Sequence, residues 1–112
     1  MKIGIPCAQR TLCMHFGHCE EFTLVQVDEK KKAVTAVDYE TPPPHAPGVL
    51  PQWLGERNVD VVIAGGMGMR AQQLFQAQGI QVVTGATGGS PEALAAAYLD
   101  KTLQTGDNVC DH

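Results

Sequence analysis

Three of the four cysteines lie close together in a segment that also contains two histidines. Residues 13–19 read CMHFGHC, and Cys7 precedes them. Thiolates and imidazoles are the ligands that zinc, copper and iron–sulfur centres take in proteins. The spacing contains no Cys-x-x-Cys pair, so it differs from the zinc-ribbon and ferredoxin patterns. We interpret Cys7, Cys13 and Cys19 as candidate metal ligands and His15 and His18 as candidate cofactor contacts.

The same cysteines also have an interpretation without a metal. Cys7 ends a run of alternating, β-branched residues, and unligated cysteine is among the side chains most often buried in a core. Cys19 would then pack behind Phe22. Both interpretations of Cys7 stay open, whereas the grouping of soft donors in residues 13–19 favours ligands there.

Two glycine-rich segments, residues 65–68 (GGMG) and residues 85–89 (GATGG), each follow a short apolar run. Glycines let a backbone approach a ligand and adopt positive φ, and the helix N-terminus that follows offers N–H groups to an anion. Neither segment has the spacing of a Walker or a dinucleotide-binding loop. The alternative to a binding role for the first segment is a tight strand-to-helix turn, with Met67 and Met69 packed in the core. The predicted cofactor contacts are Gly65, Gly66, Met67, Gly68, Gly88 and Gly89.

One more histidine lies in a stiff loop, and the chain ends in a second group of possible donors. His45 follows Pro42–Pro44, whose fixed φ limits where the loop can go, so His45 is a further predicted cofactor contact. Cys110 and His112 lie in a terminal segment of the kind that usually frays. The expected organisation is one domain over residues 1–105 and a flexible tail over 106–112.

Hydrophobic periodicity predicts the elements that position these groups. Strands are expected at 2–7, 21–28, 33–39, 59–64 and 80–84, and helices at 49–57, 69–78 and 91–105. A charged turn makes the second and third strands a hairpin, and right-handed crossovers join the others. The predicted fold class is α/β: a three-layer α/β/α sandwich, ribonuclease H-like, with a five-stranded mixed sheet in the order 3-2-1-4-5 and strand 2 antiparallel.

This topology predicts a single site. Ligands of open α/β sheets gather at the carboxyl ends of the parallel strands, near the switch point. The cysteine segment, the His45 loop and both glycine-rich segments all follow strands at that edge.

Composition excludes other classes of protein. A length of 112 residues fits one domain, and no apolar run approaches the roughly 20 residues of a membrane span. A net charge of −4 without a basic stripe argues against nucleic-acid binding. We expect a cytoplasmic protein.

Taken together, these stretches resemble the dinitrogenase iron-molybdenum cofactor biosynthesis family, which includes nitrogenase cofactor carriers and the orange protein of sulfate reducers. The similar segments are residues 15–22 (HFGHCEEF), 45–48 (HAPG), 65–68 (GGMG) with Ala71 and Phe75, and 79–85. The resemblance covers residues 1 to about 105. The first loop of this chain is unusually rich in cysteine for that family, which makes direct ligation more plausible here.

The resemblance implies a small carrier or scaffold rather than an enzyme. Its cargo would be an anionic metal–sulfur cluster of Fe–S, Mo–Fe–S or Mo–Cu–S type, bound for cofactor assembly or delivery. The implied partners are metallocluster donor and acceptor proteins, with no nucleic acid or membrane, and we expect a monomer.

Three other functions compete with this reading. The first is a simple zinc or copper module using the cysteines and histidines of residues 13–19. The second is a nuclease, which needs clustered carboxylates to hold Mg²⁺; Asp28 and Asp60 are predicted at the opposite sheet end from the glycines. The third is a cysteine-nucleophile enzyme, for which the chain carries no signature.

Overall fold

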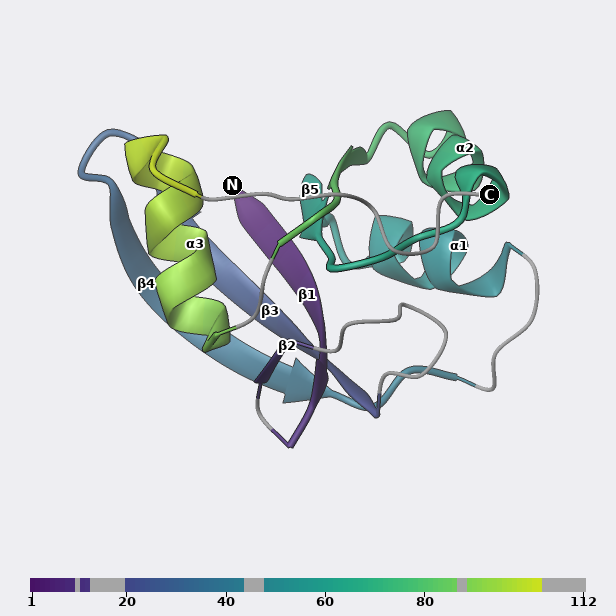
Figure 1. Ribbon diagram of the computed structural model, residues 1–112, viewed down its shortest axis with the longest axis horizontal. Helices are drawn as coiled ribbons and strands as arrows, with labels where there is room; N and C mark the ends of the chain where they lie inside the picture. The colour runs from purple at the N-terminus through teal and green to yellow at the C-terminus, as the bar shows by residue number, and fades with distance from the viewer. Residues whose placement is uncertain (10, 13–19, 44–47, 87–88, 104–112) are drawn as a thin grey trace.

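The computed structural model describes residues 1–9, 11–12, 20–43, 48–86 and 89–103 (Figure 1). The strands are β1 (Lys2–Ala8), β2 (Thr11–Leu12), β3 (Glu21–Asp28), β4 (Ala33–Glu40), β5 (Val61–Ile63) and β6 (Gln81–Val83). The helices are α1 (Val49–Glu56), α2 (Met69–Ala77) and α3 (Pro91–Asp100). The predicted mixed α/β fold with three helices is confirmed.

All of these strands belong to one sheet. Its path is β4-β3-β1-β5-β6, and β2 pairs with β1 off this path. The hairpin strand β3 is antiparallel to both β1 and β4, as predicted, whereas β5 is parallel to β1 and β6. The parallel pairs β1–β5–β6 give the sheet a common carboxyl edge.

The expected five-stranded sheet was wrong in strand number, because β2 adds a sixth strand inside the segment predicted to be a loop. Ala8 pairs with Thr11, and the turn between them holds Gln9 in the left-handed region at φ 53°. The Thr11 hydroxyl donates to the Ala8 carbonyl at 3.0 Å. A strand of two residues is too short to show any hydrophobic period, which is why the sequence did not reveal it.

Helices cover both faces of the sheet (Figure 1). The alternation of side chains along β1 divides the core: Ile3, Ile5 and Cys7 lie in the cluster that α3 covers. On the other face, a Cβ added at Gly4 would lie 3.8 Å from the side chain of Leu54 in α1. That second cluster contains buried residues of α1 and α2. The result is three layers, with the sheet in the middle.

The observed helix boundaries agree with those predicted from the sequence to within one residue, except at the C-terminal end of α3. Ser90 caps α3 as predicted, because its hydroxyl accepts the Ala93 N–H at 3.2 Å. The prediction that α3 runs to residue 105 was wrong: it ends at Asp100, and Lys101 adopts left-handed angles of φ 62° and ψ 29°. The Thr102 N–H then turns back to the Ala97 carbonyl at 2.8 Å. A lysine here takes the conformation usually left to glycine.

Within the described ranges, no helix combines the length and the apolar character that crossing a bilayer requires.

Candidate functional site

β2 positions the start of the cysteine-rich segment at the carboxyl end of β5. One edge of β1 pairs with β3 along its length, from Lys2 to Cys7. The other edge pairs first with β5, through Ile3 and Gly4, and then with β2, through Cys7 and Ala8. Because β2 is antiparallel to β1, it points from the tip of β1 toward the end of β5. This is the topological switch point of the sheet, because the strands that follow β1 in the chain lie first on one side of it (β3 and β4) and then on the other (β5 and β6).

Backbone hydrogen bonds fix both ends of this segment. The Leu12 N–H donates to the Gly89 carbonyl at 3.1 Å, and the Glu20 N–H donates to the Cys7 carbonyl at 2.9 Å. The residues between, with the predicted ligands Cys13, His15, His18 and Cys19, lie outside the described part of the chain. The structure therefore fixes where the segment starts and finishes.

The chain segments that follow β5 and β6 are joined to each other. The Gly85 N–H donates to the Gly65 carbonyl at 2.8 Å, and the Ala86 N–H donates to the Ala64 carbonyl at 3.2 Å. Gly65 and Gly66 are buried, and Gly68 is half-buried. Together with the bond from Leu12 to Gly89, these bonds bring the first hairpin and both glycine-rich segments to one edge of the sheet.

The positive φ that glycine permits is used in the second glycine-rich segment and not at Gly68. Gly68 is extended, with φ −64° and ψ 155°, and the described glycines with positive φ near this edge are Gly85 and Gly89. Gly68 instead begins α2, and its carbonyl accepts the Gln72 N–H at 3.1 Å. No side chain caps α2, and its first turn carries no acidic residue. Such an N-terminus presents N–H groups and a partial positive charge, which suits an anion.

The sequence offered core packing for both methionines of this segment, and the structure buries one of them. Met67 is fully buried between the sheet and helices α1 and α2, and its carbonyl accepts the Gln72 amide at 2.9 Å. Met69 is 54% exposed, so its predicted core packing was wrong. The sequence did contain the signal: at 100° per residue, Met69 lies about 240° around α2 from the buried Phe75. Met69 thus presents an accessible thioether at this edge.

Cys7 lies in the core. Its side chain is fully buried in the cluster beneath α3, and the Thr23 hydroxyl donates to its sulfur at 3.4 Å. Met67 belongs to the cluster on the other face of the sheet. The structure thus places Cys7 where the alternative reading put it.

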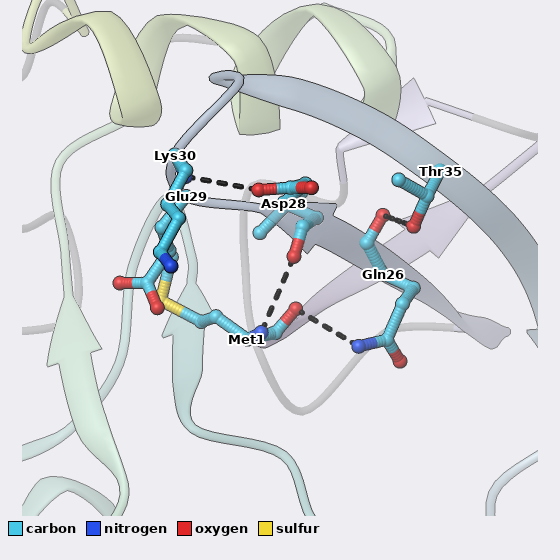
Figure 2. A pocket seen from close by; sticks show the side chains of 7 residues that line it. Met1, Gln26, Asp28, Glu29, Lys30 and Thr35 are labelled. Atoms are coloured by element: carbon cyan, nitrogen blue, oxygen red, sulfur yellow. Dashed lines mark hydrogen bonds between the residues drawn. The ribbon is translucent and has the colours of Figure 1, made fainter.

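Three hollows of the described surface lie at the opposite end of the molecule. They have volumes of about 430, 370 and 440 Å³, and all adjoin Met1 and Glu29. Figure 2 shows the first, whose polar groups bond to one another: the Lys30 N–H donates to the Asp28 carboxylate at 3.0 Å, and the Thr35 hydroxyl donates to the Gln26 carbonyl at 3.1 Å. These hollows lie at the amino end of β1, away from the glycine-rich segments.

The carboxylates are placed as the sequence predicted. Asp28 adjoins the first of these hollows and Asp60 the third, so both lie at the end opposite the candidate site. Among the residues that the structure describes, no three His, Cys, Asp or Glu side chains gather in a way that could hold a metal ion. The other predictions concern His45, Gly88, Cys110, His112 and the tail over 106–112, which lie outside the described residues.

Comparison with known proteins agrees with this fold. PH0822 is 28% identical, covers 95% of this chain and 96% of its own, and superposes with a TM-score of 0.84. The apo form of the orange protein from Desulfovibrio gigas is 21% identical, with 96% and 93% covered and a TM-score of 0.72. The protein MJ0327 of Methanocaldococcus jannaschii is 15% identical, with 96% of both chains covered and a TM-score of 0.74.

The last two similarities establish the fold alone. No protein with a curated description matches this chain. The family model described as dinitrogenase iron-molybdenum cofactor matches residues 1–101, which is most of the sequence. The chain therefore belongs to the dinitrogenase iron-molybdenum cofactor family.

Proposed function

We propose that this protein is a carrier that binds an anionic metal–sulfur cluster at the carboxyl edge of its sheet, for cofactor assembly or delivery, and that it is not an enzyme. One observation carries the proposal: the Leu12–Gly89 hydrogen bond fixes the start of the cysteine-rich segment beside the second glycine-rich segment, and the Glu20–Cys7 hydrogen bond returns its end to β1. This supports a site in which the soft donors of residues 13–19 act together with backbone N–H groups suited to an anion.

The proposed binding residues have different roles, which follow from their chemistry. Cys13 and Cys19 are the proposed metal ligands, because thiolates bind iron, copper and molybdenum–sulfur centres strongly. His15, His18 and His45 are proposed to donate hydrogen bonds to the sulfides. The N-terminus of α2 adds a favourable field. We leave Cys7 out of the ligand set, since its sulfur is buried beneath α3.

The family supports a cluster as cargo. Its description names the iron-molybdenum cofactor, and the orange protein shares the fold. We accordingly propose an iron–sulfur, molybdenum–iron–sulfur or molybdenum–copper–sulfur cluster, received from one metallocluster protein and passed to another. A carrier needs only to hold and release, so no catalytic residue is assigned.

Isolation without oxygen tests the proposal. The protein is purified anaerobically from its own organism, its visible spectrum is recorded, and iron, molybdenum, copper, zinc and acid-labile sulfide are measured. We expect visible absorption together with stoichiometric sulfide. One zinc or copper per chain without sulfide would instead establish the simple soft-metal module and overturn the carrier proposal.

A further inference from the structure

The segment from β5 to the start of α3 carries almost no charge. Charged residues make up 18% of the chain, yet Arg70 is the one charged side chain between Asp60 and Glu92. Part of this segment faces solvent. The exposed residues of α2 are Met69, Arg70, Gln73, Gln76 and Ala77. The core of a protein interface is depleted in lysine, glutamate and aspartate and enriched in methionine and arginine, so the composition of this helix face is that of an interface.

These five residues lie on one side of α2. At 100° per residue they span about 120° of the helix, with Gln73 at the centre. Phe75, on the opposite side, is fully buried in the cluster that α2 shares with the sheet and α1. Met69 is 54% exposed, which is unusual for a large apolar side chain. The exposed face of α2 is therefore continuous, and it contains apolar surface that a partner could cover.

The position of Arg70 decides which partner fits. Within the described ranges, no carboxylate forms an ion pair with Arg70. The last turn of α2 contains no basic residue to offset the partial negative charge of the helix C-terminus. A second copy with its α2 antiparallel places each Arg70 beside the C-terminal end of the other helix. A parallel copy would place Arg70 next to Arg70, where the two like charges repel.

The side chains of this face also complement one another in the antiparallel arrangement. With a two-fold axis at Gln73, Met69 faces Ala77 of the other copy, and Arg70 faces Gln76 of the other copy. The long methionine then packs over a position that has only a methyl group. Gln73 meets the same residue, which suits an amide because it carries both donors and an acceptor. A two-fold interface requires a surface that complements itself in this way.

We propose that two copies of this chain associate through the exposed faces of α2, antiparallel, about a two-fold axis at Gln73. This replaces the monomer expected from the sequence, and the inference does not depend on the proposed cargo. A helix of nine residues is about 14 Å long. The contact is therefore smaller than the roughly 1,200–2,000 Å² of a standard interface, and the dimer should dissociate on dilution.

Sedimentation velocity over a dilution series tests this in the intact protein. We expect the average mass to rise with concentration from one chain of 12.0 kDa toward two. Gln73→Lys places two like charges on the axis and should abolish the association. Ala93→Lys adds the same charge at an exposed position of α3, on the other face of the sheet, and should leave the association unchanged. A mass of one chain at every concentration, or association of Gln73→Lys equal to that of the wild type, would overturn the proposal.

Two substitutions at Gln76 test the direction of the helices. Gln76→Glu places a carboxylate opposite Arg70 of the other copy and should strengthen the association severalfold, with the gain lost in high salt. Gln76→Lys places a second cation there and should weaken it. Ala93→Glu is the control for the change in net charge and should have no effect. Circular dichroism checks that each variant is folded. In a parallel pair residue 76 would face itself, so weaker association of both Gln76 variants would overturn the antiparallel dimer.

Discussion

The backbone N–H of Leu12 donates a hydrogen bond to the carbonyl of Gly89 at 3.1 Å, between residues that lie far apart in the sequence. It ties the β1–β2 hairpin to the segment that precedes α3. Gly89 has a φ of +118°, which side-chain-bearing residues rarely adopt. The position of the hairpin relative to the second glycine-rich segment therefore depends on a glycine.

Replacing Gly89 should lower the free energy of unfolding because of the backbone conformation at this position. A Cβ at Gly89 would meet no atom within 4 Å, so steric contact is not the cause of any loss. The cost comes from the strained φ and should be about 1–3 kcal/mol for Gly89→Ala. Urea unfolding followed by circular dichroism measures this loss.

Gly55→Ala is the matched control. Gly55 lies within α1, where alanine is favoured over glycine by about 1 kcal/mol. The added Cβ would lie 3.1 Å from the amide oxygen of Gln78, an exposed side chain that can move. We expect no loss of stability. An equal loss in both variants would show that the φ of Gly89 has no special cost.

The cap of α3 offers a second test. The Ser90 hydroxyl accepts the Ala93 N–H, and removing such an N-cap costs about 1 kcal/mol. Ser90→Ala should lower the unfolding free energy by that amount, measured by urea titration. Ser90→Asp keeps an acceptor and adds a favourable charge at the helix N-terminus, so it should retain most of the stability. If Ser90→Asp lowered the unfolding free energy as much as Ser90→Ala, loss of the cap would not be the cause of the destabilisation.

Burial of Cys7 predicts its reactivity. In a variant with Cys13, Cys19 and Cys110 all changed to serine, Cys7 is the remaining thiol. Because its side chain is fully buried, a thiol reagent should react with it slowly in the folded protein and fully in guanidinium chloride. Stopped-flow measurement with a chromogenic disulfide reports both rates. Equal rates in the two conditions would contradict the core position and return Cys7 to the list of candidate ligands.

The sequence predicted most of the fold because its long elements carry clear periods. The alternation in β1 and β3, and the apolar run that includes β5, specify strands directly, and Ser90 with Pro91 marks the start of α3. The features it missed are those set by tertiary contacts. β2 has two residues and exists because it pairs with the end of β1, and Lys101 ends α3 in a conformation that its residue type does not favour.

The candidate site was predictable to a similar degree. Topology alone brought the glycine-rich segments and the start of the cysteine-rich segment to one edge, since parallel strands share their carboxyl ends. The individual side chains were harder to assign: Met67 is buried and Met69 is exposed, although both flank the same glycine. Which of two neighbouring residues faces the core depends on where the helix begins, and element boundaries are the least certain part of sequence reasoning.

The proposed ligands can be ranked by the free energy that each type contributes. A helix N-terminus such as that of α2 contributes about 0.3–1 kcal/mol, and up to about 2 when partly buried. A charge-assisted hydrogen bond from a histidine adds roughly 1.5–3 kcal/mol. Metal–thiolate ligation is far larger, since whole structural zinc sites reach about 10–16 kcal/mol. If Cys13 and Cys19 ligate the cluster, they dominate its affinity.

Titration with a reconstituted cluster, followed by visible absorption, checks this ranking. Cys13→Ser with Cys19→Ser should abolish cluster retention. Met67→Leu should weaken it by less than tenfold, about 1.4 kcal/mol, because the Met67 side chain is buried and leucine replaces its volume closely. Comparable stability of both variants in urea would show that neither result comes from unfolding. Stoichiometric binding by the double serine variant would mean that backbone N–H groups and histidines hold the cluster alone, and the assignment of residues 13–19 as ligand donors would be wrong.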